Sequence, residues 1–228
     1  MPRPRSSPSE QPADKAARKR KAHAWTGDEL LHLLDNSLAH LAMTTSILQE
    51  HDFPRQRMLY HMQMMQFHVQ YLALVAQAWV LLNEVKTQAP ARFQEAHELN
   101  EVLVIALRAY DREQLGIDVR TSPELPRLRG DRRQWQFLFR ALIHMAVMQG
   151  QRCRIEVLNS PGKQLVTLKF RRYGQVEGGL TATALRLLLE ACYYIIERHG
   201  GQFTVKDAHV EDWRAVATMP YTEPQDLP

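Results

Sequence analysis

The sequence predicts an α+β fold in which a helical hairpin precedes a sandwich of helices and a mixed sheet. Two long stretches with apolar residues at helical spacing come first, between residues 26 and 90. Beyond residue 97, helical and alternating patterns follow in the order α-β-α-β-β-α-β-β, which is typical of a mixed sheet with helices on one face. The chain has 228 residues, of which 45% are hydrophobic, so it can bury a real core.

The hairpin is expected to consist of two helices that start after Thr26 and after Pro54. Thr26-Gly27-Asp28 offers a helix start, and Pro54 disfavours helix at Phe53. Both helices carry an apolar stripe, which comprises Leu30, Leu31, Leu34, Leu38, Leu41 and Ile47 in the first and Met58, Met62, Met65, Val69, Leu72, Ala76 and Trp79 in the second. The second stripe alternates steps of three and four, the period of helices that pack in a bundle. We therefore expect an antiparallel hairpin whose apolar seam is covered by a second copy, giving a dimeric four-helix bundle.

The sandwich, residues 97–220, is expected to follow a linker at residues 87–96. A helix is predicted at 99–114, a strand at 117–120 and a helix at 131–149, whose apolar stripe is Trp135, Leu138, Leu142 and Met145. Strands at 152–158 and 165–171 flank the turn signal Asn159-Ser160-Pro161-Gly162. A helix at 180–199 stops at Gly200-Gly201, strands at 202–206 and 213–218 complete the sheet, and a polar tail covers 221–228.

The basic charge of the chain belongs to its first 25 residues. The formal net charge is +4, but residues 1–25 hold seven Lys or Arg residues against two acidic ones, which leaves the rest at −1. This tail is rich in Pro, Ser and charge, so we expect it to be disordered. It is interpreted as a solubilising leader. The alternative is a weak, salt-sensitive polyanion contact through Arg18, Lys19, Arg20 and Lys21.

The composition favours the reducing cytoplasm and no membrane partner. Cys153 and Cys192 lie in apolar strand-like and helix-like contexts, so no disulfide is expected. The longest apolar run, residues 71–82, falls short of the roughly 20 residues that span a bilayer, and the N-terminus lacks the apolar region of a secretory signal. The His- and Met-rich run at residues 61–68 is interpreted as helix packing, so no metal site is expected.

Several stretches resemble the core of bacterial sensor histidine kinases, in order and at the usual spacing. Residues 98–103 (ELNEVL), 115–119 (LGIDV) and 125–131 (LPRLRGD) resemble the opening of the ATP-binding domain, and residues 197–202 (ERHGGQ) resemble its last helix and exit strand. Upstream, residues 32–38 (HLLDNSL) fit the frame of the phosphoacceptor box, in which a histidine opens the dimerising hairpin. The resemblance covers about residues 27–220 and implies a histidine-kinase-type ATPase-like domain behind the hairpin.

The residues with which this family holds Mg²⁺ and ATP are replaced on the helix after Gly130-Asp131. Arg140 and His144 stand where the resemblance implies two asparagines. Imidazole is a poor ligand for a hard, oxygen-preferring ion. We therefore predict that neither ATP nor Mg²⁺ is a cofactor.

The adenine and phosphate positions implied by the resemblance are altered as well. After the strand, the chain gives Arg171-Arg172-Tyr173-Gly174 in place of an aspartate, and a guanidinium has no acceptor to offer the adenine amino group. Only Gly178 and Gly179 remain of the phosphate-binding glycines, and residues 173–179 leave no room for a flexible lid. Arg140, His144, Arg172, Gly174, Gly178 and Gly179 are therefore interpreted as vestigial positions.

His32 is the phosphoacceptor candidate that the resemblance implies. Asn36 matches the family pattern, whereas Leu33 replaces an acidic residue and Ser37 a proline. His40, two helical turns along, is a rival acceptor. Neutral imidazole can attack an aspartyl phosphate without any ATP site, so phosphotransfer would survive the loss of kinase activity. The alternative is a surface or seam histidine without this role.

The resemblance thus implies a degenerate histidine-kinase-like protein of two-component signalling. It would form a homodimer and bind a response-regulator receiver domain, as a scaffold or as a phosphotransfer intermediate through His32, without autokinase activity. Two alternatives stay open. One is an active autokinase with Arg140 and His144 in a divergent pocket, and the other is a dimeric nucleic-acid-associated protein that uses the basic tail.

Overall fold

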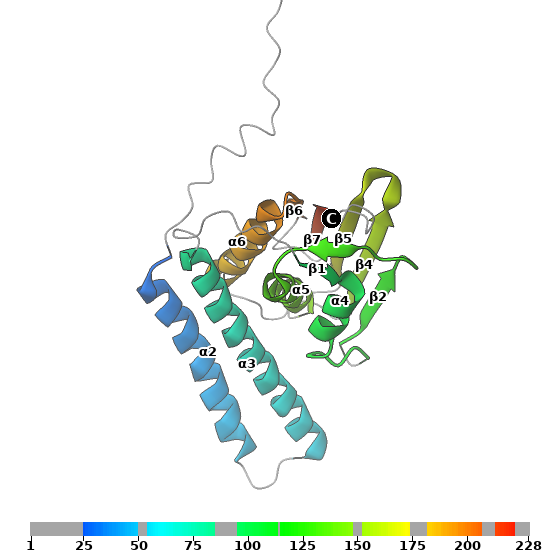
Figure 1. Cartoon of the computed structure of the whole chain (residues 1–228). Coiled ribbons are helices and arrows are strands. Elements are labelled where there is room, and N and C mark those ends of the chain that lie inside the picture. The colour runs from blue at the N-terminus through cyan, green and yellow to red at the C-terminus, as the bar shows by residue number, and fades with distance from the viewer. Residues whose placement is uncertain are drawn as a thin grey trace, which may run out of the picture.

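The computed structural model describes residues 25–49, 54–84, 95–113, 115–147, 152–173, 182–206 and 213–221. Helices α2 (Gly27–Leu48) and α3 (Arg55–Glu84) form a long hairpin that extends beyond the rest of the chain (Figure 1). The remaining elements form a sandwich beside the upper half of α3. Apart from Trp25 and Tyr221, the two predicted tails lie outside the described residues.

The start of α2 has the local chemistry that the sequence predicts. The backbone N–H of Glu29 donates a 3.2 Å hydrogen bond to Thr26 Oγ1, and the backbone N–H of Thr26 donates one of 3.0 Å to Glu29 Oε2. This reciprocal capping box satisfies two amide donors that the first helical turn leaves unpaired. Asp28 and Glu29 also place negative charge at the positive end of the helix dipole. The helix start is therefore determined locally.

The sandwich combines a five-stranded mixed sheet with three helices on one face (Figure 1). The sheet order is β2-β4-β5-β7-β6, with β2 parallel to β4 and the other neighbours antiparallel. The five strands are β2 (Ile117–Thr121), β4 (Arg152–Ser160), β5 (Leu165–Tyr173), β6 (Gln202–Lys206) and β7 (Arg214–Pro220). The helices are α4 (Leu99–Leu107), α5 (Arg132–Val147) and α6 (Ala182–Arg198). A turn of 3₁₀ helix, Pro161–Lys163, joins β4 to β5.

Two features of the sandwich differ from the prediction. Helix α4 ends at Leu107 instead of residue 114, because the chain turns at Tyr110, whose hydroxyl donates a 3.2 Å hydrogen bond to the Arg140 carbonyl. A short antiparallel pair, β1 (Ala96–Glu98) with β3 (Arg127–Arg129), was not predicted as a sheet. Strands of three residues carry too little periodicity to be recognised from sequence. The remaining predicted elements are present, although Gln114 and residues 148–149 and 180–181 lie outside the described part.

The hairpin and the sandwich share one continuous core. The predicted stripe of α5 is buried, since Trp135, Leu138, Leu142 and Met145 are at most 1% exposed. Helix α3 contributes its own buried face, made of Tyr71, Leu74, Val75 and Ala78, to the same cluster. The hairpin is therefore packed onto the helical side of the sandwich, away from the open face of the sheet (Figure 1).

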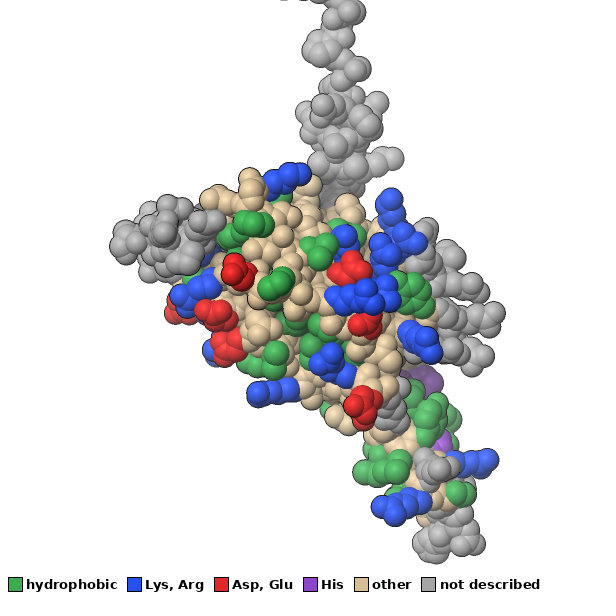
Figure 2. Space-filling model, turned by 90° about the vertical axis from the view of Figure 1, so that its right-hand side faces the viewer, with side chains coloured by type: hydrophobic (Ala, Val, Ile, Leu, Met, Phe, Trp, Pro, Cys, Tyr) green, Lys and Arg blue, Asp and Glu red, His purple; other side chains and the backbone are tan. Residues whose placement is uncertain are grey.

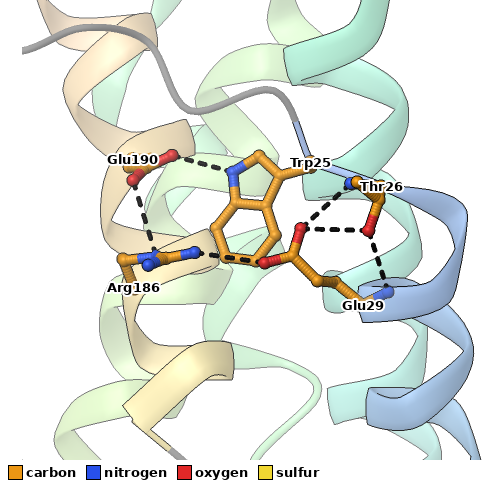
Figure 3. Close-up of polar contacts among 5 residues, drawn as sticks. All are labelled: Trp25, Thr26, Glu29, Arg186 and Glu190. Carbon is orange, nitrogen blue, oxygen red and sulfur yellow. Dashed lines mark hydrogen bonds and ion pairs between the residues drawn. The ribbon is translucent and has the colours of Figure 1, made fainter.

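Trp25 connects the start of the hairpin to α6 through polar contacts (Figure 3). Its indole Nε1 donates a 2.7 Å hydrogen bond to Glu190 Oε2, and the Arg186 guanidinium lies 4.6 Å from the ring centroid. Arg186 also contacts Glu29 at 3.4 Å and Glu190 at 3.8 Å. The indole is 6% exposed. This cluster joins α2 to α6 in addition to the apolar packing of α3.

One helical segment among the described residues, Arg57–Asn83, is apolar and long enough to cross a membrane by length and composition alone, with a mean hydropathy of 1.2. The apolar run recognised in the sequence, residues 71–82, is shorter than this segment. Polar residues interrupt the segment without lowering its mean hydropathy much. A helix that packs on both sides inside a protein has the same composition. Tyr71, Leu74 and Val75 of this segment are buried against the sandwich.

Candidate functional site

His32 lies on the exposed side of α2, two turns from the helix start. Its Nε2 is 3.4 Å from the Asn36 amide Nδ2, one helical turn further on. The amide N–H donates in this contact, a geometry that fits the neutral imidazole tautomer with its proton on Nδ1. The neighbours Leu33 and Ser37 point inward and are buried. The contact thus orients an imidazole on the exposed side of α2.

His40, the rival acceptor, is held in a different environment. Its ring stacks on His68 of α3 with centroids 5.2 Å apart and planes inclined by 7°. Burial first, and then the nearby His40, lower the pKa of His68. His40 therefore lies in the α2–α3 contact, whereas His32 faces outward. The sequence offered no sign that His68 would be the partner of His40, since the two lie on different helices.

Part of the predicted apolar seam is exposed in a single chain. Of the eleven large apolar side chains that are exposed in the described residues, nine belong to α2 and α3. They include Leu31, Leu38, Met62 and Val69, each more than half exposed. Within one chain α2 buries a different face, which holds Leu33, Ser37 and Thr44. Met62, which was expected to pack in the core, instead belongs to the uncovered seam.

His144, which stands where the resemblance implies an asparagine, lies inside the core. The side chain is 0% exposed and lies among Phe67, Tyr71 and Tyr110, with ring centroids 5.2, 6.1 and 6.2 Å away. Its Nδ1 is 3.3 Å from the Tyr110 hydroxyl. Burial, followed by the charges of His68 and Arg140, lowers the pKa of His144 to about 3. This neutral imidazole is closed to any ligand, because α3 covers it.

Arg140 lines a cleft of about 580 Å³ between α3, α5 and α6. Gln77 and Val80 of α3, Asp131 and Arg133 near the start of α5, and Tyr194 of α6 also line it. The Nε atom of Arg140 is buried without a hydrogen-bond partner among the described residues. The cleft therefore places Arg140 beside the hairpin, on the opposite side of α5 from the sheet.

Arg172 and Arg171 lie on opposite faces of β5. Arg172 is 0% exposed, and its backbone N–H bonds to the Trp213 carbonyl at 3.0 Å. Arg172 therefore belongs to the core, because the two-residue period of the strand turns its side chain inward. Arg171 points to the open face of the sheet. Gly174, Gly178, Gly179 and the basic run Arg18–Lys21 lie outside the described residues.

The described residues contain no group of three or more His, Cys, Asp or Glu side chains that could hold a metal ion. Both cysteines are buried as free thiols, and burial raises the pKa of Cys153 to about 12. His32 and His40 are both exposed imidazoles on the hairpin, and of the two His32 is the one that contacts Asn36.

Comparisons with known proteins agree with this geometry. No protein-family model matches the chain, and no curated protein matches it. Among solved structures, the histidine kinase AdeS of Acinetobacter baumannii is 17% identical, covers 83% of this chain and 97% of that chain, and has a TM-score of 0.50. Full-length ShkA, crystallised in complex with AMPPNP, is 12% identical over 84% of this chain and 46% of that chain, with a TM-score of 0.52. The cytoplasmic segment of the histidine kinase QseC is 19% identical over 67% of this chain and 95% of that chain, with a TM-score of 0.47.

The fold is that of a histidine kinase core. At these identities the likeness concerns the fold, and the hairpin is part of it because the matches cover more than four fifths of the chain. Within this histidine-kinase-like fold, α2 and α3 form the helical hairpin, and the sandwich has the ATPase-like fold. The sequence prediction of an α+β fold with these two parts is confirmed.

Proposed function

We propose that this protein is a phosphotransfer component of two-component signalling, which accepts a phosphoryl group on His32 from a response-regulator receiver domain and passes it on. The observation that carries the proposal is the exposed His32, whose Nε2 is oriented by Asn36 at 3.4 Å. Phosphotransfer needs an accessible imidazole with a free lone pair and no nucleotide. A scaffold that binds the receiver domain without transfer is the second candidate.

The chemistry requires only these groups and the aspartyl phosphate of the partner. The Nε2 lone pair leaves the Asn36 hydrogen bond and forms an N–P bond as the acyl P–O bond breaks. The aspartate carboxylate departs with the electron pair, and the Nδ1 proton goes to water. In the second step a carboxylate of another receiver domain attacks phosphorus, and the N–P bond breaks while Nδ1 regains a proton from water. Asn36 positions the ring and its tautomer.

Several observations support a protein without its own ATP chemistry. The imidazole of His144 is fully buried beneath α3, so it cannot serve as a metal ligand in an autokinase pocket. Arg172 is buried on the inner face of β5. We therefore propose that neither ATP nor Mg²⁺ is a cofactor. Saturable binding of MgATP in the micromolar range, measured by calorimetry, would overturn this part and favour the autokinase.

The exposed apolar side chains of the hairpin favour a homodimer. Nine exposed apolar side chains on α2 and α3 exceed what a monomer usually leaves to solvent in one region. A second hairpin would cover them and form a four-helix bundle, with one His32 on each outer face. We place this homodimer in the cytoplasm, since receiver domains reside there and both cysteines are free thiols.

The test is phosphotransfer from receiver domains encoded in the same genome, labelled on their aspartate by a radioactive phosphoramidate. We expect acid-labile, alkali-stable label on the wild-type chain and none on His32→Ala. The matched control is His40→Ala, which removes an imidazole of the same helix and should keep the transfer. Loss in His40→Ala alone would assign the acceptor to His40. If the receiver domain bound but neither the wild-type chain nor any variant became labelled, the result would support the scaffold function.

A further inference from the structure

A row of cations crosses the open face of the sheet. The strand register places Arg154 of β4 opposite Arg171 of β5, and Arg171 opposite Arg214 of β7. Lys206 of β6 in turn lies opposite Arg214. Four basic residues therefore stand side by side on four neighbouring strands. With strands about 4.8 Å apart, the row is about 14 Å long.

The whole outer face of the sheet is basic. Its described strands carry seven Lys or Arg residues against two acidic ones, Asp118 and Glu156; the basic residues are Arg120, Arg152, Arg154, Lys169, Arg171, Lys206 and Arg214. Residues 26–228 have a net charge of −1, so an acidic excess elsewhere on the chain offsets this face. Figure 2 shows the side of the molecule opposite the α2–α3 side, with basic side chains spread over it and fewer acidic ones between them. On the described strands of this face, basic residues therefore outnumber acidic ones.

The two acidic residues of the described strands lie on β2 and β4, at one end of this surface. Asp118 accepts contacts of 3.0 Å from Arg154 and 3.2 Å from Arg120, and Glu156 lies 3.8 Å from Lys169. Arg171, at the centre of the row, has arginines opposite it on both sides. Like charges directly opposite each other destabilise a sheet. The row therefore opposes folding, and an anionic ligand would relieve the repulsion.

We propose that this face binds the phosphate backbone of single-stranded nucleic acid. The row is linear, so its cations can follow the phosphates of one extended strand in sequence. Arginine presents a fork of donors that suits phosphate oxygens. Tyr173, 37% exposed beside the row, offers a ring on which a base can stack. Tyr173 also lies 5.8 Å from the Arg154 guanidinium, so charge and ring are adjacent.

The proposed surface is independent of the phosphotransfer site. Helices α5 and α6 lie between the sheet and the hairpin, so a strand bound to the outer face does not reach His32 (Figure 1). It also differs from the basic tail, because Arg171 belongs to the folded sheet. Inorganic polyphosphate offers the same linear phosphates, and the experiment distinguishes the two sources.

The test measures the binding of a fluorescent single-stranded dodecanucleotide to the full chain by anisotropy at several salt concentrations. Arg171→Glu places a carboxylate between two arginines, and we expect at least a tenfold weaker Kd with a shallower salt dependence. The matched control is Lys163→Glu, an equal charge change at the exposed β4–β5 turn, which should stay within twofold. Both variants keep the tail, so their difference reports the sheet face alone.

The remaining outcomes decide the ligand class. Arg171→Glu should also raise the thermal unfolding midpoint, because it turns two repulsive cross-strand pairs into attractive ones. This result separates loss of binding from loss of fold. Equal weakening by both variants would overturn the proposal, and so would poly-glutamate competing as well as the oligonucleotide. Polyphosphate that competes better than a single strand of equal charge would replace nucleic acid as the ligand. Phosphoryl transfer through His32 should not change in either variant.

Discussion

The indole Nε1 of Trp25 donates a 2.7 Å hydrogen bond to Glu190, which joins the residue before the capping box of α2 to a helix 165 residues later in the chain. The contact is the centre of a small polar cluster with Arg186 and Glu29. It holds the start of the hairpin, and hence the turn that carries His32, at one place on the ATPase-like domain.

Replacing Trp25 by Phe should destabilise the chain through the loss of this hydrogen bond. A hydrogen bond to a charged acceptor is worth about 1.5–3 kcal/mol, and partial exposure of Glu190 lowers the expected cost to about 1–2 kcal/mol. Trp79→Phe is the matched control, since the Trp79 Nε1 is buried without a partner among the described residues. Urea unfolding of both variants isolates the hydrogen bond. If Trp25→Phe and Trp79→Phe had equal free energies of unfolding, the hydrogen bond would not contribute to stability.

Gly130→Ala should destabilise the junction between β3 and α5. Gly130 has φ +144°, a conformation that side chains rarely adopt, and a Cβ there would overlap the His199 ring and lie 2.7 Å from the Trp135 indole nitrogen. We expect a loss of about 2 kcal/mol or more in the free energy of unfolding. Gly162→Ala is the control, because nothing lies within 4 Å of its Cβ position. A similar unfolding midpoint for both variants would argue against the close approach.

The free energy of unfolding should fall as the pH is lowered from 6.5 toward 3. In this range His144 is neutral in the folded chain and protonated in the unfolded chain. Its pKa is about 3 in the fold and about 6.5 when unfolded, so the unfolded chain binds the extra proton first. The stabilisation is complete above pH 6.5 and declines as the pH falls toward 3. Between pH 7 and pH 5 this amounts to about 2 kcal/mol. His68 shifts in the same direction.

The variant His144→Leu should unfold with a smaller change between pH 7 and pH 5 than the wild type. Urea titrations at the two pH values measure it. The exposed His32→Leu serves as the control and should keep the wild-type pH dependence. If His144→Leu also kept it, the buried imidazole would not be the group responsible.

Val69→Glu should convert the proposed dimer into a monomer. Val69 is 55% exposed on the seam of α3, and a carboxylate there would be buried without a partner in the four-helix bundle. Light scattering should give a mass near 26.4 kDa for the variant and twice that for the wild type. Val104→Glu, on α4 and 42% exposed, places the same charge outside the seam and should leave the mass unchanged. A monomeric wild type would refute the bundle.

Much of the fold could be predicted because its signals are local. The capping box at Thr26, the break before Pro54 and the bounds of β6 at 202–206 depend on residues a few positions apart. The stripe of α5 was also recognised, since four apolar residues at helical spacing form one face whatever lies opposite. The candidate site was predicted in part: the residues His32 and Asn36 were found, but their contact and exposure were not.

The sequence by itself determined the element order, the hairpin and the position of a candidate acceptor, because periodicity and capping act over a few residues. The tertiary structure alone decided which face of each element is covered. It buried His144 beneath α3, turned Arg172 inward and left Met58, Met62 and Val69 of the predicted α3 stripe exposed. It also aligned Arg154, Arg171 and Arg214, because strand register brings distant residues together only when the sheet forms.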